Sequence, residues 1–127
     1  MNVKVLLVED NDANRYLATF LLESGGFHVV HAANGIEALA RARAELPDVI
    51  LMDIHMPEMD GYEAARLIRE EPGLAQTPLI AVTSYAMVGD RDKAMKIGFV
   101  GYIEKPISTE TFVAQIRQFL PPPPESP

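Results

Sequence analysis

The sequence contains no cysteine, which excludes a disulfide framework and any thiol chemistry and is compatible with a reducing compartment. Basic residues are scarce, with 11 lysines and arginines against 18 aspartates and glutamates, so the net charge is −7. Because binding to a phosphate backbone requires a positive field, we expect no direct nucleic-acid partner. No apolar run reaches the roughly 18 residues of a membrane span, and no signal-peptide pattern precedes the first apolar segment. We therefore expect a cytoplasmic protein that does not act on membranes.

The sequence does contain a regular alternation of two kinds of segment. Short apolar runs, typical of buried strands, are followed by stretches with helical spacing and by Gly or Pro breaks. Strands are predicted at 3–8, 27–32, 49–53, 78–82 and 100–104, and helices at 15–23, 35–46, 61–70, from 89 or 90 to 97, and at 109–120. Right-handed crossovers place such helices on both faces of a parallel sheet, so the predicted fold class is α/β.

The predicted helices carry apolar stripes of unequal strength. The first follows an N-cap at Asn11 or Asp12, and its spacing is set by Tyr16, Leu17, Phe20, Leu21 and Ser24. In the third, Ala65, Leu67 and Ile68 are expected to face inward. The fourth has a sparse stripe and is the element expected to move most readily, whereas the last is expected to be capped by Ser108, with Phe112, Ile116, Phe119 and Leu120 on one face.

With 127 residues, the chain is long enough for one domain with a substantial core. We predict a domain over 1–120 and a proline-rich tail over 121–127. The tail cannot continue a helix and is interpreted as an untethered end or a cut linker rather than a ligand for an aromatic groove.

Polar side chains follow the ends of four predicted strands. Glu9 and Asp10 follow the first, Asp53 ends the third, Thr83 follows the fourth and Lys105 follows the fifth. In a flavodoxin-like sheet of order 2-1-3-4-5, a site forms beyond the carboxyl ends of strands 1 and 3. If this order holds, all five side chains share one pocket.

Three carboxylates in one small site require a cation or a proton. Two like charges about 4 Å apart repel by roughly 4 kcal/mol at an effective dielectric of 20. Mg²⁺ suits a site of carboxylates, waters and phosphate oxygens, and an aspartate beside it can act as a nucleophile toward a phosphoryl group. With an ammonium from Lys105 and a hydroxyl from Thr83, the set is typical of phosphoryl transfer.

Each of these residues also has an ordinary interpretation. An isolated Asp53 is most often a turn residue or helix cap, Lys105-Pro106 can be a surface turn, and Thr83 a strand exit. Tyr102 is an ordinary strand aromatic in most proteins. The three histidines, at 28, 31 and 55, lack metal-binding spacing.

Taken together, the motifs resemble the receiver domain of two-component response regulators. They are Glu9-Asp10, Asp53 with Met56-Pro57 and Met59-Asp60-Gly61, Thr83, Tyr102, and Lys105-Pro106. The resemblance covers about residues 3–120, and within the family it favours the stand-alone chemotaxis and polar-differentiation regulators. It implies a flavodoxin-like, doubly wound sheet of five parallel strands with five helices.

The resemblance also implies residue roles. Asp53 would accept a phosphoryl group from a histidine kinase or a histidine phosphotransfer protein. Glu9, Asp10, Asp53 and the main-chain carbonyl of His55 would hold Mg²⁺, with Glu9 acting mainly through a metal-bound water.

The remaining implied roles concern the response to the phosphoryl group. Thr83 and Lys105 would bind its oxygens, and Tyr102 would be the aromatic switch that biases the surface of the fourth helix, fifth strand and fifth helix. The side chains of His55 and Tyr85 would tune access of water to the phosphoryl group. The kinase is expected at the exposed start of the first helix, around Asn14, Arg15 and Ala18.

The predicted protein is thus a signalling switch that catalyses only its own phosphorylation and dephosphorylation, as a monomer or a weak phosphorylation-dependent dimer. Two alternative functions are open. A phosphatase of the haloacid dehalogenase type is suggested by Asp10-x-Asp12, but the chain has no length to spare for a cap domain. A receiver-like module that is never phosphorylated would have lost acidic or lysine positions, and here all are filled.

Overall fold

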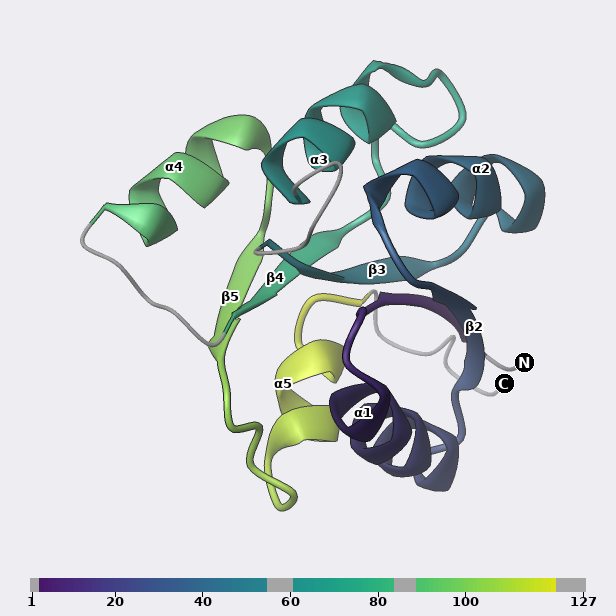
Figure 1. Ribbon diagram of the computed structural model, residues 1–127, viewed down its shortest axis with the longest axis vertical. Coiled ribbons are helices and arrows are strands. Elements are labelled where there is room, and N and C mark those ends of the chain that lie inside the picture. The colour runs from purple at the N-terminus through teal and green to yellow at the C-terminus, as the bar shows by residue number, and fades with distance from the viewer. Residues whose placement is uncertain (1–2, 55–60, 84–88, 121–127) are drawn as a thin grey trace, which may run out of the picture.

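The computed structural model describes residues 3–54, 61–83 and 89–120 of the chain. Five strands alternate with five helices (Figure 1). In chain order the elements are β1 (Lys4–Val8), α1 (Asp12–Ser24), β2 (His28–Ala32), α2 (Gly35–Glu45), β3 (Val49–Asp53), α3 (Gly61–Glu70), β4 (Leu79–Thr83), α4 (Asp90–Ile97), β5 (Gly101–Glu104) and α5 (Phe112–Arg117). The predicted α/β alternation is therefore confirmed.

All five strands are parallel and form one sheet of order β2-β1-β3-β4-β5. In the centre of the sheet, Val8 of β1 pairs with Met52 of β3, and Asp53 pairs with Val82 of β4. Thr83 pairs with Glu104 of β5. The chain order thus reverses between β1 and β3, which confirms the predicted flavodoxin-like topology and places the ends of β1, β3, β4 and β5 at one edge.

Helices cover both faces of the sheet, with α1 and α5 below it and α2, α3 and α4 above it in Figure 1. Each face has its own core: the first lies under α2, α3 and α4 and includes Ile50 and Ile68, and the second lies under α1 and α5 and includes Leu51 and Phe112. The central strands β3 and β4 are buried along their whole length because both faces are covered. Among the described residues, no helix is long and apolar enough to cross a membrane.

Two helices differ in detail from their predictions. In α1 the buried residues are Ala18 and Leu22, whereas Tyr16 and Phe20 are 76% and 59% exposed. Both pairs have i, i+4 spacing, so periodicity did not distinguish the stripe that faces the core. Asn11 is the N-cap, and its side chain accepts a hydrogen bond from the Asn14 amide, as expected for one of the two predicted caps.

The last helix begins later than predicted. Thr111 is the N-cap of α5, so the predicted cap at Ser108 is wrong. Ser108 contributes only its main-chain oxygen, which accepts hydrogen bonds from the amides of Thr111 and Phe112 at 3.3 and 2.9 Å. Phe119 and Leu120 follow the helix and are half-buried against the second core. In the third helix, Ala65 and Ile68 are buried as predicted and Leu67 is half-buried.

Candidate functional site

The sheet brings the predicted acidic residues together at its carboxyl edge. Glu9 follows β1 and is 4% exposed, Asp53 ends β3 and is 7% exposed, and Asp10 is exposed beside them. One carboxylate oxygen from each lies within 4.8 Å of the others. Buried carboxylates at this separation repel each other strongly, so the cluster requires a positive counter-charge.

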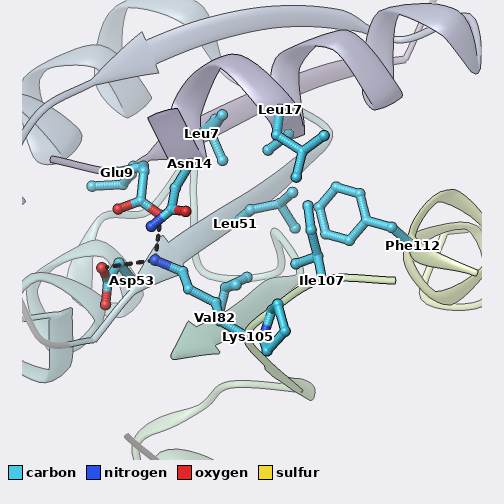
Figure 2. Close-up of a pocket in the computed structure, with 13 residues that line it drawn as sticks. Leu7, Glu9, Asn14, Leu17, Leu51, Asp53, Val82, Lys105, Ile107 and Phe112 are labelled. Carbon is cyan, nitrogen blue, oxygen red and sulfur yellow. Dashed lines mark hydrogen bonds and ion pairs between the residues drawn. The ribbon is translucent and has the colours of Figure 1, made fainter. Parts of the chain in front are cut away.

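Lys105 supplies that charge among the described residues. Its ammonium lies 2.5 Å from Oε1 of Glu9 and 3.2 Å from Oδ2 of Asp53 (Figure 2). The backbone aims the side chain, because the amide of Lys105 donates a 2.7 Å hydrogen bond to the carbonyl of Thr83 at the end of the neighbouring strand. The lysine therefore crosses from the β5 end of the sheet to the two carboxylates in its centre.

The pKa values of the pair reflect burial and mutual attraction. Burial raises the pKa of Glu9 above its ordinary value, and the hydrogen bond and charge of Lys105 offset this only in part, with Asp53 opposing them. Burial by itself lowers the pKa of Lys105, but the hydrogen bond to Glu9 and the charge of Asp53 outweigh it, and the net shift is upward. Lys105 is thus held as a cation at neutral pH.

The start of α1 supports Glu9 from the other side. The amide of Asn11 donates to Oε2 of Glu9 at 3.3 Å, and the Arg15 guanidinium donates to its main-chain oxygen at 3.3 Å. Asp12 points elsewhere: its side chain is 90% exposed and is paired with Arg15. The second acid of the Asp10-x-Asp12 pattern is therefore outside the cluster, which weighs against a phosphatase of the haloacid dehalogenase type.

Thr83 and Tyr102 lie on the side of the site toward α4. Thr83 is fully buried at the end of β4. Tyr102 is half-buried on β5, and its hydroxyl is buried with no hydrogen-bond partner among the described residues. The Arg91 guanidinium of α4 lies 5.7 Å from the centre of the Tyr102 ring. His55 and Tyr85, together with Met56-Pro57 and Met59-Asp60, lie outside the described residues, so their predicted roles stay predictions.

A small apolar pocket of about 60 Å³ adjoins Lys105 and was not expected from the sequence. Leu17 of α1 and Ile107, just after Lys105-Pro106, line it beside Asn14 (Figure 2). In the predicted surface at the start of α1, Asn14 is exposed as expected and Arg15 is half-buried, but Ala18 is buried, so that part of the prediction is wrong, and Leu17 is the exposed residue beside it. Sequence spacing could not show that two segments so distant in the chain form one pocket.

The donor set indicates which ion would fit. Glu9, Asp10 and Asp53 offer only carboxylate oxygens, the ligands that a hard divalent cation such as Mg²⁺ prefers. The partial exposure of the cluster at Asp10 leaves room for water ligands, which Mg²⁺ usually retains. The site therefore fits Mg²⁺.

The fold and the site together define a class of protein: a doubly wound α/β domain with an acidic cluster and a half-buried lysine at its topological switch point. The chain belongs to the response regulator receiver domain family, whose model matches residues 5–117. Members of this family are signalling switches of two-component systems and interact with histidine kinases or phosphotransfer proteins. The family resemblance predicted from the sequence is thus confirmed.

Known proteins similar to the chain include single receiver domains. It is 41% identical over 120 residues to the polar-differentiation response regulator DivK of Brucella anthropi, covering 94% of this chain and 98% of that protein. The chemotaxis response regulator CheY4 of Vibrio cholerae is 31% identical with a TM-score of 0.89, covering 94% and 100% of the two chains. The receiver domain of the sensor histidine kinase PA1611 from Pseudomonas aeruginosa is 34% identical with a TM-score of 0.86, covering 94% and 98%, and has a magnesium ion coordinated in its active-site cleft.

Proposed function

We propose that Asp53 is the phosphoacceptor of this receiver domain and takes its phosphoryl group from a histidine kinase or a histidine phosphotransfer protein. A carboxylate oxygen of Asp53 would attack phosphorus, the phosphorus–nitrogen bond of the donor phosphohistidine would break, and the imidazole nitrogen would leave with the electron pair. One observation carries the proposal: Asp53 lies within a three-carboxylate cluster with an ammonium 3.2 Å from its Oδ2.

Glu9, Asp10 and Asp53 would hold Mg²⁺, with Glu9 acting through a water and the main-chain carbonyl of His55 completing the set. The ion, when bound, neutralises negative charge around the acceptor. Lys105 would leave Glu9 and bind a phosphoryl oxygen, because the Glu9 carboxylate and the phosphoryl group are both anionic partners for its ammonium. The ammonium would move only a short distance, because it already lies between Glu9 and Asp53.

Phosphorylation adds about −1.5 to −2 charge beside Thr83 and Lys105. We propose that Thr83 donates its hydroxyl to the phosphoryl group, that Tyr102 responds as the switch, and that the surface of α4, β5 and α5 changes for a downstream protein. The unpartnered hydroxyl of Tyr102 among the described residues supports this role, because a buried hydroxyl without a partner gains from a new arrangement. The donor would dock at α1 beside the pocket of Asn14 and Leu17.

Incorporation of phosphate tests the assignment. Wild-type protein with Mg²⁺ is expected to be modified by acetyl phosphate and to bind beryllofluoride, whereas Asp53→Asn does neither. Asp12→Asn is the matched control, because that exposed carboxylate lies outside the cluster. Mass spectrometry distinguishes the variants, and equal phosphate incorporation in Asp53→Asn contradicts the proposal.

The division into a domain over 1–120 and a tail over 121–127 stays a prediction, as do the tuning roles of His55 and Tyr85. Measuring dephosphorylation of His55→Ala and Tyr85→Ala tests the tuning roles, and rates equal to wild type in both variants remove them.

A further inference from the structure

The first turn of α4 is held between two tyrosine rings from different elements. The Tyr62 hydroxyl of α3 lies 3.3 Å from Oδ1 and 3.4 Å from the main-chain oxygen of Asp90, and it donates to this pair. Lys93 places its ammonium 4.3 Å from the centre of the Tyr62 ring. On the other side, Arg91 lies over the ring of Tyr102. Through its contacts with Asp90 and Lys93, Tyr62 therefore links α3 to α4.

Among the described residues, α4 has one buried residue, Ala94, and its N-cap, Gly89, makes no side-chain capping bond. The hydrogen bond and the cation–π contacts at Asp90, Arg91 and Lys93 therefore contribute to the placement of this helix. Contacts of this kind are individually weak, so a helix held by them can shift at low cost.

Tyr62 is also directly connected to the phosphoacceptor strand. Gly61, its chain neighbour, donates its amide to the Ile54 carbonyl at 3.3 Å. A Cβ atom on Gly61 would lie 2.8 Å from the carbonyl oxygen of Asp53, so the start of α3 rests on the backbone of the acceptor residue. The Tyr62 ring is fixed by an edge-on contact with Phe99, with centroids 6.5 Å apart. A continuous path of contacts thus runs from Asp53 through Gly61 and Tyr62 to Asp90.

We propose that Tyr62 is a positioning residue that couples Asp53 to α4, and that its hydroxyl bond to Asp90 belongs to the unmodified arrangement and is released on phosphorylation. The inference rests on the proposed function. Tyr62 would thus provide a second connection between the site and α4, besides Tyr102. This connection lies on the other side of α4 and begins at the backbone of the acceptor strand. Since the bond stabilises the unmodified arrangement, its removal favours the modified one, and by linkage strengthens binding at Asp53.

Beryllofluoride binding and nuclear magnetic resonance test this inference on the full chain. In Tyr62→Phe, which keeps the ring, the amide resonances of α4 in the free protein are expected to move toward their positions in the beryllofluoride-bound wild type. The affinity for beryllofluoride in the presence of Mg²⁺ is expected to rise about fivefold, the fold-change associated with one intramolecular hydrogen bond. Lys93→Met removes the other contact to the ring and is expected to act in the same direction.

Tyr16→Phe is the matched control, because it removes the same hydroxyl group from an exposed side chain on α1. Among the described residues, the Tyr16 hydroxyl has no hydrogen bond. Resonances and affinity are expected to equal those of the wild type. Wild-type α4 resonances together with unchanged affinity in Tyr62→Phe overturn the inference, and so does a weaker affinity, because the bond would then belong to the modified arrangement. Failure of the proposed function is separate: the wild type itself would not respond to beryllofluoride.

Discussion

Replacing Lys105 by methionine tests whether its ammonium holds the acidic cluster together. At 2.5 Å from Glu9 and 3.2 Å from Asp53, its Coulomb attractions are about 7 and 5 kcal/mol at an effective dielectric of 20, before the loss of hydration is counted. Removing one partner of a buried ion pair typically costs about 3–5 kcal/mol, because the remaining charge is buried without compensation. We expect Lys105→Met to lose at least about 3 kcal/mol in free energy of unfolding at pH 7.

Urea unfolding followed by circular dichroism measures this loss. With a slope of about 2 kcal/mol/M, a loss of about 3 kcal/mol lowers the midpoint by about 1.5 M. Lys4→Met is the matched control: Lys4 pairs with Glu45 at 3.1 Å, but the two side chains are 33% and 30% exposed, so about 0–1 kcal/mol is expected. A loss for Lys105→Met within about 1 kcal/mol of this control refutes the reasoning.

The pH dependence of stability provides a second test of the Glu9–Lys105 pair. The pKa of Glu9 is raised on folding, so its contribution to stability is fully present below its unfolded pKa and is lost as pH rises through its folded pKa. Without Lys105 the pKa of Glu9 rises further, and the deficit of Lys105→Met is expected to shrink as pH falls from 7 toward 5. The pKa of Lys105 is also raised, so in wild type its contribution is lost only when pH rises through that folded pKa.

Two other substitutions test the frame of the site. Gly61→Ala would place its Cβ 2.6 Å from the Cα of Ile54, and its free energy of unfolding is expected to fall by about 1–3 kcal/mol. The control is Gly73→Ala, whose Cβ would lie 3.8 Å from its nearest neighbour atom and which is expected to be near neutral. Equal melting temperatures for the two variants contradict the close approach at Gly61. The Arg69 guanidinium donates to four main-chain carbonyls, including that of Gly98 after α4. Arg69→Gln is therefore expected to lower the free energy of unfolding by about 2–3 kcal/mol and to speed hydrogen exchange in the segment after α3. Arg69→Lys is expected to restore little of this loss. Unchanged exchange in Arg69→Gln would show that these bonds are dispensable.

Several elements were predictable because their signals are local. Helix α4 begins at Asp90, one of its two predicted starts, and ends at Ile97 as predicted, since glycines at 89 and 98 flank it and both have positive φ angles. Strands β3 and β4 carry unbroken apolar runs because helices cover both faces of the sheet.

Other features were decided by packing rather than by local pattern. The i, i+4 pairs Tyr16/Phe20 and Ala18/Leu22 have the same period, and only the position of α1 against the sheet buries the second pair. The smaller side chains let the helix approach the strands closely, and the aromatic pair remains in solvent. The start of α5 likewise escaped prediction, because Ser108 and Thr111 are both polar residues suited to precede a helix.

The sequence by itself determined the α/β alternation and the polar residues that end the strands, because both depend on neighbours in the chain. Only the tertiary structure decided how those residues meet. Parallel pairing in the order β2-β1-β3-β4-β5 brings Glu9 and Lys105, 96 positions apart, to a separation of 2.5 Å, and brings α3 from Asp53 to the first turn of α4. Such contacts arise because the crossovers of a parallel sheet place all carboxyl ends of the strands at one edge.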